Sequence, residues 1–154
     1  PLQIPWSKVK KYSDLVVQEI RKYSDNLIIA GTPTWSQGVD IAARKPIESI
    51  NVTYGLHFYA GSHFDELRLK GDIAMTRDAS LFVSEWGSVN ADGKGEVSHK
   101  SSDMWLDWMK EKKISWCNWS VSNKDEGASI WNASGRLTDA GWYIRLRFCT
   151  EPVS

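Results

Sequence analysis

The segment LFVSEWG, Leu81 to Gly87, decides the predicted fold. It begins with three apolar residues, passes through Ser84 to the carboxylate of Glu85, and ends on an indole and a glycine. A short run with apolar residues at both odd and even positions is typical of a strand that is buried on both faces in a parallel sheet. A carboxylate at the end of such a run indicates that the strand leaves the core at a polar site.

Three other segments repeat this pattern, and helical patterns lie between them. The expected strands cover residues 26–31, 51–61, 81–87 and 114–121, and the expected helices cover residues 5–23, 41–45, 64–77, 102–112 and 138–148. Ser7 is the expected N-cap of the first helix, and Trp105, Trp108 and Met109 are expected to pack a later helix against the sheet. Strand starts recur about every 30 residues, as β/α units do.

Four β/α units make half of a (β/α)8 TIM barrel, which usually needs about 250 residues. An isolated half would leave two strand edges and an apolar face uncovered. The pattern also fits a small open sheet, or a half that pairs with another half. No tract of linker composition divides residues 1–154, so a single domain is expected.

Composition narrows the functional classes. The chain has 154 residues with 19 basic and 19 acidic side chains, a formal net charge of +0, so no basic stripe indicates nucleic acid. No apolar run is long enough to span a membrane. The 9 tryptophans favour flat apolar surfaces that stack on sugars, bases or a partner. A bridge between Cys117 and Cys149 is possible, but Cys117 lies in an apolar run and is expected to be a buried filler.

Polar side chains follow the end of every expected strand, in the segments GTPTWSQ, HFYAGSH, SEWG and NWSVSNKDE. In β/α folds the loops at these ends converge on one ligand site. Rigid backbone would hold Glu85 still there, as a nucleophile requires. Retaining cleavage of a glycosidic bond uses two carboxyl groups about 5–5.5 Å apart. Tyr59 and His57 would donate hydrogen bonds to the ionised one, and Trp119 would stack on the sugar ring.

The segments IIAGTPTWSQGVDIAA, LHFYAGSH, LFVSEWG and ISWCNWSVSNKDE together resemble glycoside hydrolase family 5, in particular its endo-β-1,4-glucanases. The resemblance covers nearly the whole chain, with the four segments in order. It implies that residues 1–154 are the C-terminal half of a (β/α)8 barrel, strands five to eight. It also implies a secreted cellulase that hydrolyses β-1,4-glucan with retention and needs no metal or organic cofactor.

The resemblance assigns the catalytic roles residue by residue. Glu85 matches the nucleophile at the end of strand seven. His57 and Tyr59 match the strand-six residues that line the point of cleavage, with Tyr59 bonded to the nucleophile.

The same resemblance assigns five sugar contacts. Trp119 matches the indole beneath the sugar on the non-reducing side, and Lys124 and Glu126 resemble more distal contacts there. Trp35 and His63 resemble contacts on the leaving-group side.

One part of the family pattern is missing. The acid/base glutamate of the family lies in an Asn-Glu-Pro motif at the end of strand four, and the residues from Pro1 onward resemble the stretch that follows it. Without a general acid, proton transfer loses a factor of about 10²–10⁴ in rate. The isolated chain is therefore expected to be nearly inactive on unactivated glucan. Activity would need an N-terminal half-barrel, a second copy as a homodimer partner, or a carboxylate from its own loops.

Two other functional classes stay open. A non-catalytic glucan-binding half-barrel would keep the aromatic surface without turnover, and Glu85→Gln would leave its binding unchanged. A module that binds protein through a tryptophan-rich surface does not explain polar groups at four strand ends.

Overall fold

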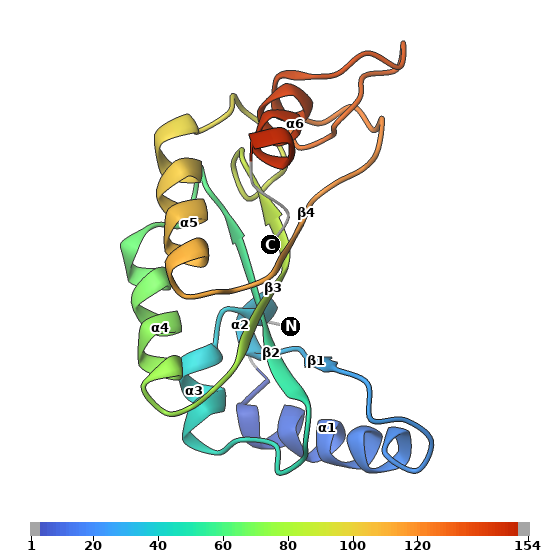
Figure 1. Cartoon of the computed structure of the whole chain (residues 1–154), viewed down its shortest axis with the longest axis vertical. Coiled ribbons are helices and arrows are strands. Elements are labelled where there is room, and N and C mark those ends of the chain that lie inside the picture. The colour runs from blue at the N-terminus through green and yellow to red at the C-terminus, as the bar shows by residue number, and fades with distance from the viewer. Residues whose placement is uncertain (1–3, 151–154) are drawn as a thin grey trace.

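Parallel strands with helices along one side form the centre of the molecule (Figure 1). The computed structural model describes residues 4–150. The elements are α1 (Trp6–Ile20), β1 (Ile28–Ala30), α2 (Pro33–Ser36), α3 (Val39–Arg44), β2 (Val52–Tyr59), α4 (Asp65–Met75), β3 (Leu81–Gly87), α5 (His99–Glu111), β4 (Trp116–Asn118) and α6 (Asp139–Thr150). The strands pair in parallel in the order β1-β2-β3-β4. The predicted α/β class is confirmed.

Every predicted strand forms, but the two edge strands are short. β1 and β4 have 3 residues each, whereas β2 has 8 and β3 has 7. Helix α1 begins at Trp6 and is capped by Pro5 in an extended conformation, so the predicted N-cap Ser7 is wrong. Proline is favoured where a helix starts because it lacks an N–H that the first turn could not bond. No helix in residues 4–150 is long and apolar enough to cross a membrane.

The helix-facing side of the sheet holds the core. Along β2, Leu56 and Phe58 are fully buried against the helices. Phe58 stacks between Trp86 of β3 and Trp105 of α5, with ring centroids 5.4 and 3.8 Å away. Stacked aromatic groups of this kind add to the stability that burial provides. The predicted packing role of Trp105 is confirmed, and Trp108 and Met109 are buried beside it.

Within one stretch of the sheet, β3 contains one residue more than the segments of β2 and β4 that pair with it. Between the pairs Gly55↔Phe82 and His57↔Glu85, β3 advances by three residues while β2 advances by two. Its pairing with β4 shifts in the same region. Such a β-bulge bends a strand and turns a side chain toward a new direction, and bulges are common beside active sites. The bulge therefore lies immediately before the carboxylate of Glu85.

Arg21 ties the end of α1 to the loops that precede β1 and β2. Its Nη1 donates to the carbonyl oxygens of Ser24 at 3.0 Å and Asn26 at 2.9 Å. Its Nη2 donates to the carbonyl oxygens of Ile50 at 2.6 Å and Asn51 at 3.1 Å. A planar guanidinium can serve four acceptors at once, which an ammonium group cannot do in the same geometry.

Arg21→Ala is expected to lower the free energy of unfolding by about 1–3 kcal/mol, because the carbonyl groups lose donors that the fold places around one side chain. Urea denaturation measures the change. Lys22→Ala is the matched control, because Lys22 is exposed and pairs only at the surface with Glu19, so it should cost less than about 0.5 kcal/mol. Equal losses in the two variants would contradict the tying role of Arg21.

The prediction that Cys117 is a buried filler is wrong. Cys117 and Cys149 are both exposed and unbridged. Cys117 lies between Trp116 and Asn118 on the edge strand β4, and Trp116 packs against Trp86 on the helix side. Because side chains alternate along a strand, Cys117 faces the open side of the sheet, away from the core.

Candidate active site

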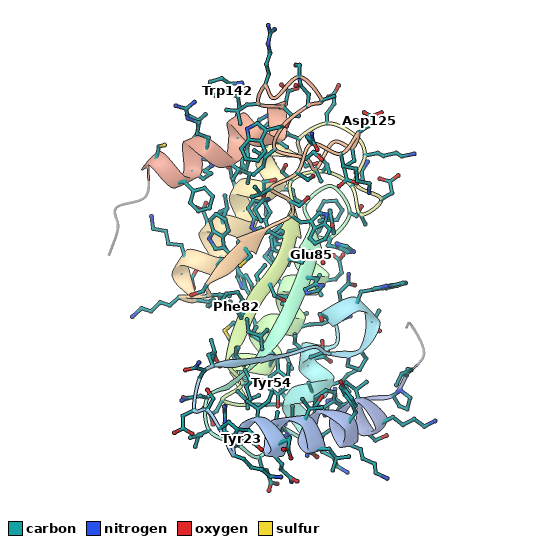
Figure 2. The ribbon with its side chains drawn as sticks, turned by 90° about the vertical axis from the view of Figure 1, so that its right-hand side faces the viewer. Tyr23, Tyr54, Phe82, Glu85, Asp125 and Trp142 are labelled. Atoms are coloured by element: carbon teal, nitrogen blue, oxygen red, sulfur yellow. The ribbon has the colours of Figure 1, made fainter. Side chains whose placement is uncertain are left out.

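Two neighbouring strands bring Glu85, Tyr59 and His57 together at their C-terminal ends. His57 of β2 lies opposite Glu85 of β3 in the parallel register. The Tyr59 hydroxyl donates to Glu85 Oε1 at 2.9 Å, and His57 Nδ1 lies 3.5 Å from Glu85 Oε2. Figure 2 shows Glu85 further along the sheet than Phe82, toward the end that carries Asp125. The predicted proximity of these three side chains is therefore present in the structure.

Tyr59 stays a neutral hydroxyl in this position. Burial raises its pKa above the usual value, and the hydrogen bond to Glu85 and the negative charges of Glu85 and Glu126 raise the pKa further. A phenol that does not ionise near neutral pH can only donate its proton to the carboxylate. The Glu85 carboxylate thus has a permanent donor on Oε1.

His57 is held in its neutral form. Burial lowers its pKa below the usual 6.5, and the nearby charge of Glu85 opposes that shift only in part. His57 and Glu85 are both about a quarter exposed, at 26% and 27% of the side chain, so they line an open surface. The other ring nitrogen, Nε2, lies 2.9 Å from the Ser84 hydroxyl.

His63 supports the backbone beneath Tyr59. The Tyr59 backbone N–H donates to His63 Nδ1 at 2.9 Å, so Nδ1 carries a lone pair and Nε2 carries the proton. The Gln37 side-chain amide lies 3.1 Å from Nε2, and because Nε2 carries the proton, the amide presents its oxygen as the acceptor. Both ring nitrogens already have protein partners, so a sugar contact from His63 would have to displace Gln37.

His63 is expected to make stability sensitive to acid. Burial lowers its pKa in the folded chain below the usual 6.5, so the unfolded chain binds the proton first as the pH falls. Neutral His63 contributes its full share of stability when the pH is above the pKa that His63 has in the unfolded chain. This share is lost as the pH falls through the lower pKa that His63 has in the folded chain. Urea unfolding of wild type and His63→Gln, from about pH 8 to 5, should show a stability difference that narrows on acidification. A difference independent of pH would contradict this link.

The two indoles that were predicted to contact the sugar, Trp119 and Trp35, are both exposed near strand ends. Trp119 is 46% exposed and Trp35 is 59% exposed. The Trp119 backbone N–H donates to the carbonyl oxygen of Trp86 at 2.7 Å, which holds Trp119 next to the residue that follows Glu85. The peptide bond between Trp119 and Ser120 is cis.

Trp35 lies in a left-handed turn that the sequence did not indicate. Thr34, Trp35 and Ser36 have φ angles of 57°, 49° and 61°, where residues other than glycine are uncommon. Left-handed backbone costs roughly 1–2 kcal/mol per residue. The Ser36 N–H donates to the Thr32 carbonyl at 3.1 Å and the Gly38 N–H to the Pro33 carbonyl at 3.0 Å, which stabilises the turn. Strained backbone of this kind is concentrated at functional sites.

Lys124 and Glu126 form an ion pair with each other. Lys124 Nζ donates to Glu126 Oε2 at 2.6 Å, with Lys124 largely exposed and Glu126 mostly covered. The negative charge of Glu126 contributes to the raised pKa of Tyr59, so Glu126 faces the same region. A sugar hydroxyl at this place would compete with an existing bond.

Sequence reasoning did not find Ser84, Gln37 or the bulge. In the structure Leu81, Val83 and Trp86 are buried, and the odd step from Val83 to Trp86 fits the bulge. The sequence does not show this step, because Phe82 is apolar as well. In residues 4–150 no three His, Cys, Asp or Glu side chains gather closely enough to hold a metal ion.

The molecule is a β/α protein with a parallel sheet. At the ends of two neighbouring strands a glutamate lies beside a phenol and an imidazole, so the candidate site is centred on a carboxylate. The chain belongs to glycosyl hydrolase family 5, because the family model described as "Cellulase (glycosyl hydrolase family 5)" matches residues 2–125. The predicted resemblance is confirmed.

Curated relatives agree with this family. Endoglucanase Z of Dickeya dadantii (strain 3937) is 47% identical over 148 residues, which are 94% of this chain and 35% of that protein. An endoglucanase of Clostridium saccharobutylicum is 44% identical over 135 residues, 87% of this chain and 30% of that protein. The chain thus spans about a third of the length of the curated relatives it matches.

Solved structures agree as well. Cellulase Cel5C_n superposes with a TM-score of 0.94 at 39% identity, covering 99% of this chain and 49% of that chain. The catalytic domain of a Thermobifida fusca endoglucanase superposes with a TM-score of 0.90 at 28% identity, covering 97% of this chain and 55% of that chain. The α/β fold with its four-stranded sheet therefore corresponds to about half the length of each of these two chains.

Proposed function

We propose that residues 1–154 are the C-terminal half of the barrel, strands five to eight, of a retaining endo-β-1,4-glucanase. The observation that carries this proposal is the bond of 2.9 Å from the Tyr59 hydroxyl to Glu85, made between neighbouring strand ends. The relatives named endoglucanase support the activity, and a Thermobifida fusca endoglucanase variant with a TM-score of 0.87 and 26% identity was solved in complex with cellotetraose.

Glu85 is the nucleophile in this proposal. A carboxylate oxygen attacks the anomeric carbon, the bond from that carbon to the leaving oxygen breaks, and a glycosyl ester forms on Glu85. The acid/base carboxyl group of the complementary half gives its proton to the leaving oxygen in this step. Water then attacks the same carbon and gives a proton back to that group, the ester bond breaks, and Glu85 returns as a carboxylate. Two inversions at one carbon retain its β configuration. Tyr59 and His57 orient the carboxylate and stabilise its negative charge before the attack and again as the ester bond breaks.

The remaining site residues hold the polymer. Trp119 provides a flat face for the sugar on the non-reducing side, and Lys124 with Glu126 provides polar contacts further along. Trp35 and His63 lie on the leaving-group side in the same proposal. The substrate is a polymer too large to enter a cell, so the parent protein is proposed to act outside it.

The acid/base carboxylate is proposed to come from the complementary N-terminal half-barrel. The same partner would pair with the edge strands β1 and β4 and cover an apolar stripe on α1. The exposed apolar residues there are Tyr12, Leu15, Val16 and Ile20 of α1, Tyr23 and Leu27 of the segment that follows it, and Ile29 of β1. A second copy of the chain is the other candidate partner, and light scattering on the isolated chain distinguishes a dimer from a monomer.

A chimera tests the proposed activity. It joins the complementary half of Dickeya dadantii Endoglucanase Z to residues 1–154, and is incubated with carboxymethylcellulose and with a soluble cello-oligosaccharide. We expect the release of reducing sugar. NMR should show that the newly formed reducing end of the first product has the β configuration. Binding without hydrolysis would favour the non-catalytic alternative, and an α product would contradict the role of Glu85.

A further inference from the structure

The bulge in β3 places Ser84 and Glu85 on the same side of the sheet. In a regular strand, consecutive side chains point to opposite faces. Here both side chains contact His57: the Ser84 hydroxyl lies 2.9 Å from Nε2, and Glu85 Oε2 lies 3.5 Å from Nδ1. The extra residue between the pairs Gly55↔Phe82 and His57↔Glu85 makes this possible.

The imidazole of His57 therefore lies between a hydroxyl and a carboxylate. A neutral imidazole carries one proton, on either Nδ1 or Nε2, and the partner of each nitrogen decides which. A carboxylate only accepts hydrogen bonds, whereas a serine hydroxyl can donate or accept. Only one arrangement satisfies both neighbours of the neutral ring: Ser84 donates to Nε2, and Nδ1–H points at Glu85.

Gly55 leaves the space that this arrangement needs. A Cβ at position 55 would lie 3.1 Å from the Ser84 hydroxyl oxygen, closer than ordinary contact. A side chain there would push the hydroxyl out of line with the His57 ring. The absence of a side chain at residue 55 thus fits a defined position for the Ser84 hydroxyl.

We propose that Ser84 is a positioning residue that donates its hydroxyl proton to His57 Nε2 and so holds His57 as the Nδ1–H tautomer directed at Glu85. The inference deepens the proposed function, because it assumes that Glu85 is the nucleophile. Glu85 then has one donor for each oxygen, Tyr59 for Oε1 and His57 for Oε2. The 3.5 Å separation is longer than an ordinary hydrogen bond, as is common for catalytic contacts before substrate binds.

The tautomer can be measured on the chain itself by long-range proton–nitrogen NMR of the histidine rings at neutral pH. His57→Gln assigns the signals. Wild type should show His57 protonated on Nδ1. Ser84→Ala should raise the Nε2-protonated population about five- to tenfold, the equivalent of one neutral hydrogen bond, and Ser84→Thr should restore the wild-type ring because it keeps the hydroxyl. His63 should be unchanged in every variant.

An Nε2-protonated His57 in wild type, or a tautomer unchanged in Ser84→Ala, would overturn the proposal. Kinetics of the chimera provide a second measure, with kcat about five- to tenfold lower in Ser84→Ala, KM unchanged and recovery in Ser84→Thr. If the chimera shows the expected tautomers but hydrolyses nothing, the role of Ser84 is supported and the proposed function is contradicted. A failure of the Ser84 proposal can therefore be distinguished from a failure of the proposed function.

Discussion

Glu85→Gln is expected to lower the rate at which the chimera cleaves dinitrophenyl β-cellobioside by about 10⁴-fold or more, because the amide cannot form the glycosyl ester. Glutamine has the shape of glutamate, and its amide oxygen can still accept the hydrogen bond from Tyr59. The fold should therefore persist. Initial rates of dinitrophenol release give kcat/KM, and a thermal unfolding scan of the same sample checks the fold.

Glu96→Gln is the matched control for this variant. Glu96 lies exposed in the loop between β3 and α5, so the same chemical change there should alter kcat/KM by less than about twofold. A Glu85→Gln chimera that keeps a tenth or more of the wild-type rate would contradict a nucleophilic role. Equal losses in both variants would indicate damage to the fold rather than to the site.

The second large effect is a difference between substrates for the isolated chain. Dinitrophenolate leaves without protonation, whereas a sugar hydroxyl needs a proton from an acid as it leaves. The isolated chain is therefore expected to cleave the aryl cellobioside. On cello-oligosaccharides its rate relative to the chimera should be lower than its relative rate on the aryl cellobioside, by a factor of about 10²–10⁴. Relative rates of chain and chimera on the two substrates measure this factor.

A chimera whose complementary half carries its acid/base glutamate as glutamine is the control. It restores the barrel without the acid, so it should resemble the isolated chain in preferring the aryl substrate. If the isolated chain hydrolysed cello-oligosaccharides as fast as the intact chimera, a carboxylate within residues 1–154 would be the acid, and the proposed contribution of the complementary half would be wrong.

The two central strands of the sheet could be predicted because most of their residues are apolar and buried. Apolar residues at both odd and even positions of residues 51–61 and 81–87 indicate a parallel strand without knowledge of its neighbours. The edge strands were predicted too long, because their outer residues bond to no further strand in the described part of the chain. Cys117 shows the same effect: its apolar context indicated burial, but the open side of β4 leaves it exposed.

The proximity of Glu85, Tyr59 and His57 could be predicted, but the bulge and the hydrogen bonds around them could not. Polar groups at four strand ends indicated that Glu85, Tyr59 and His57 would meet, because parallel strands end at one edge. The bulge depends on register with two neighbouring strands, which one chain segment cannot reveal. The partners of His63 depend in the same way on the fold of the loop that carries Gln37. The roles of all these residues stay predictions until they are tested.

Covalent trapping of the nucleophile tests the central claim most directly. The isolated chain is incubated with a dinitrophenyl fluoro-cellobioside, whose fluorine slows both steps while the activated leaving group keeps the first one possible without a general acid. Mass spectrometry of the digested chain should find one added fluoro-cellobiosyl group on the peptide that contains Glu85, and none in Glu85→Gln. A label on another carboxylate, or an unlabelled chain that nonetheless releases dinitrophenol, would contradict the assignment of Glu85 as the residue that attacks the sugar.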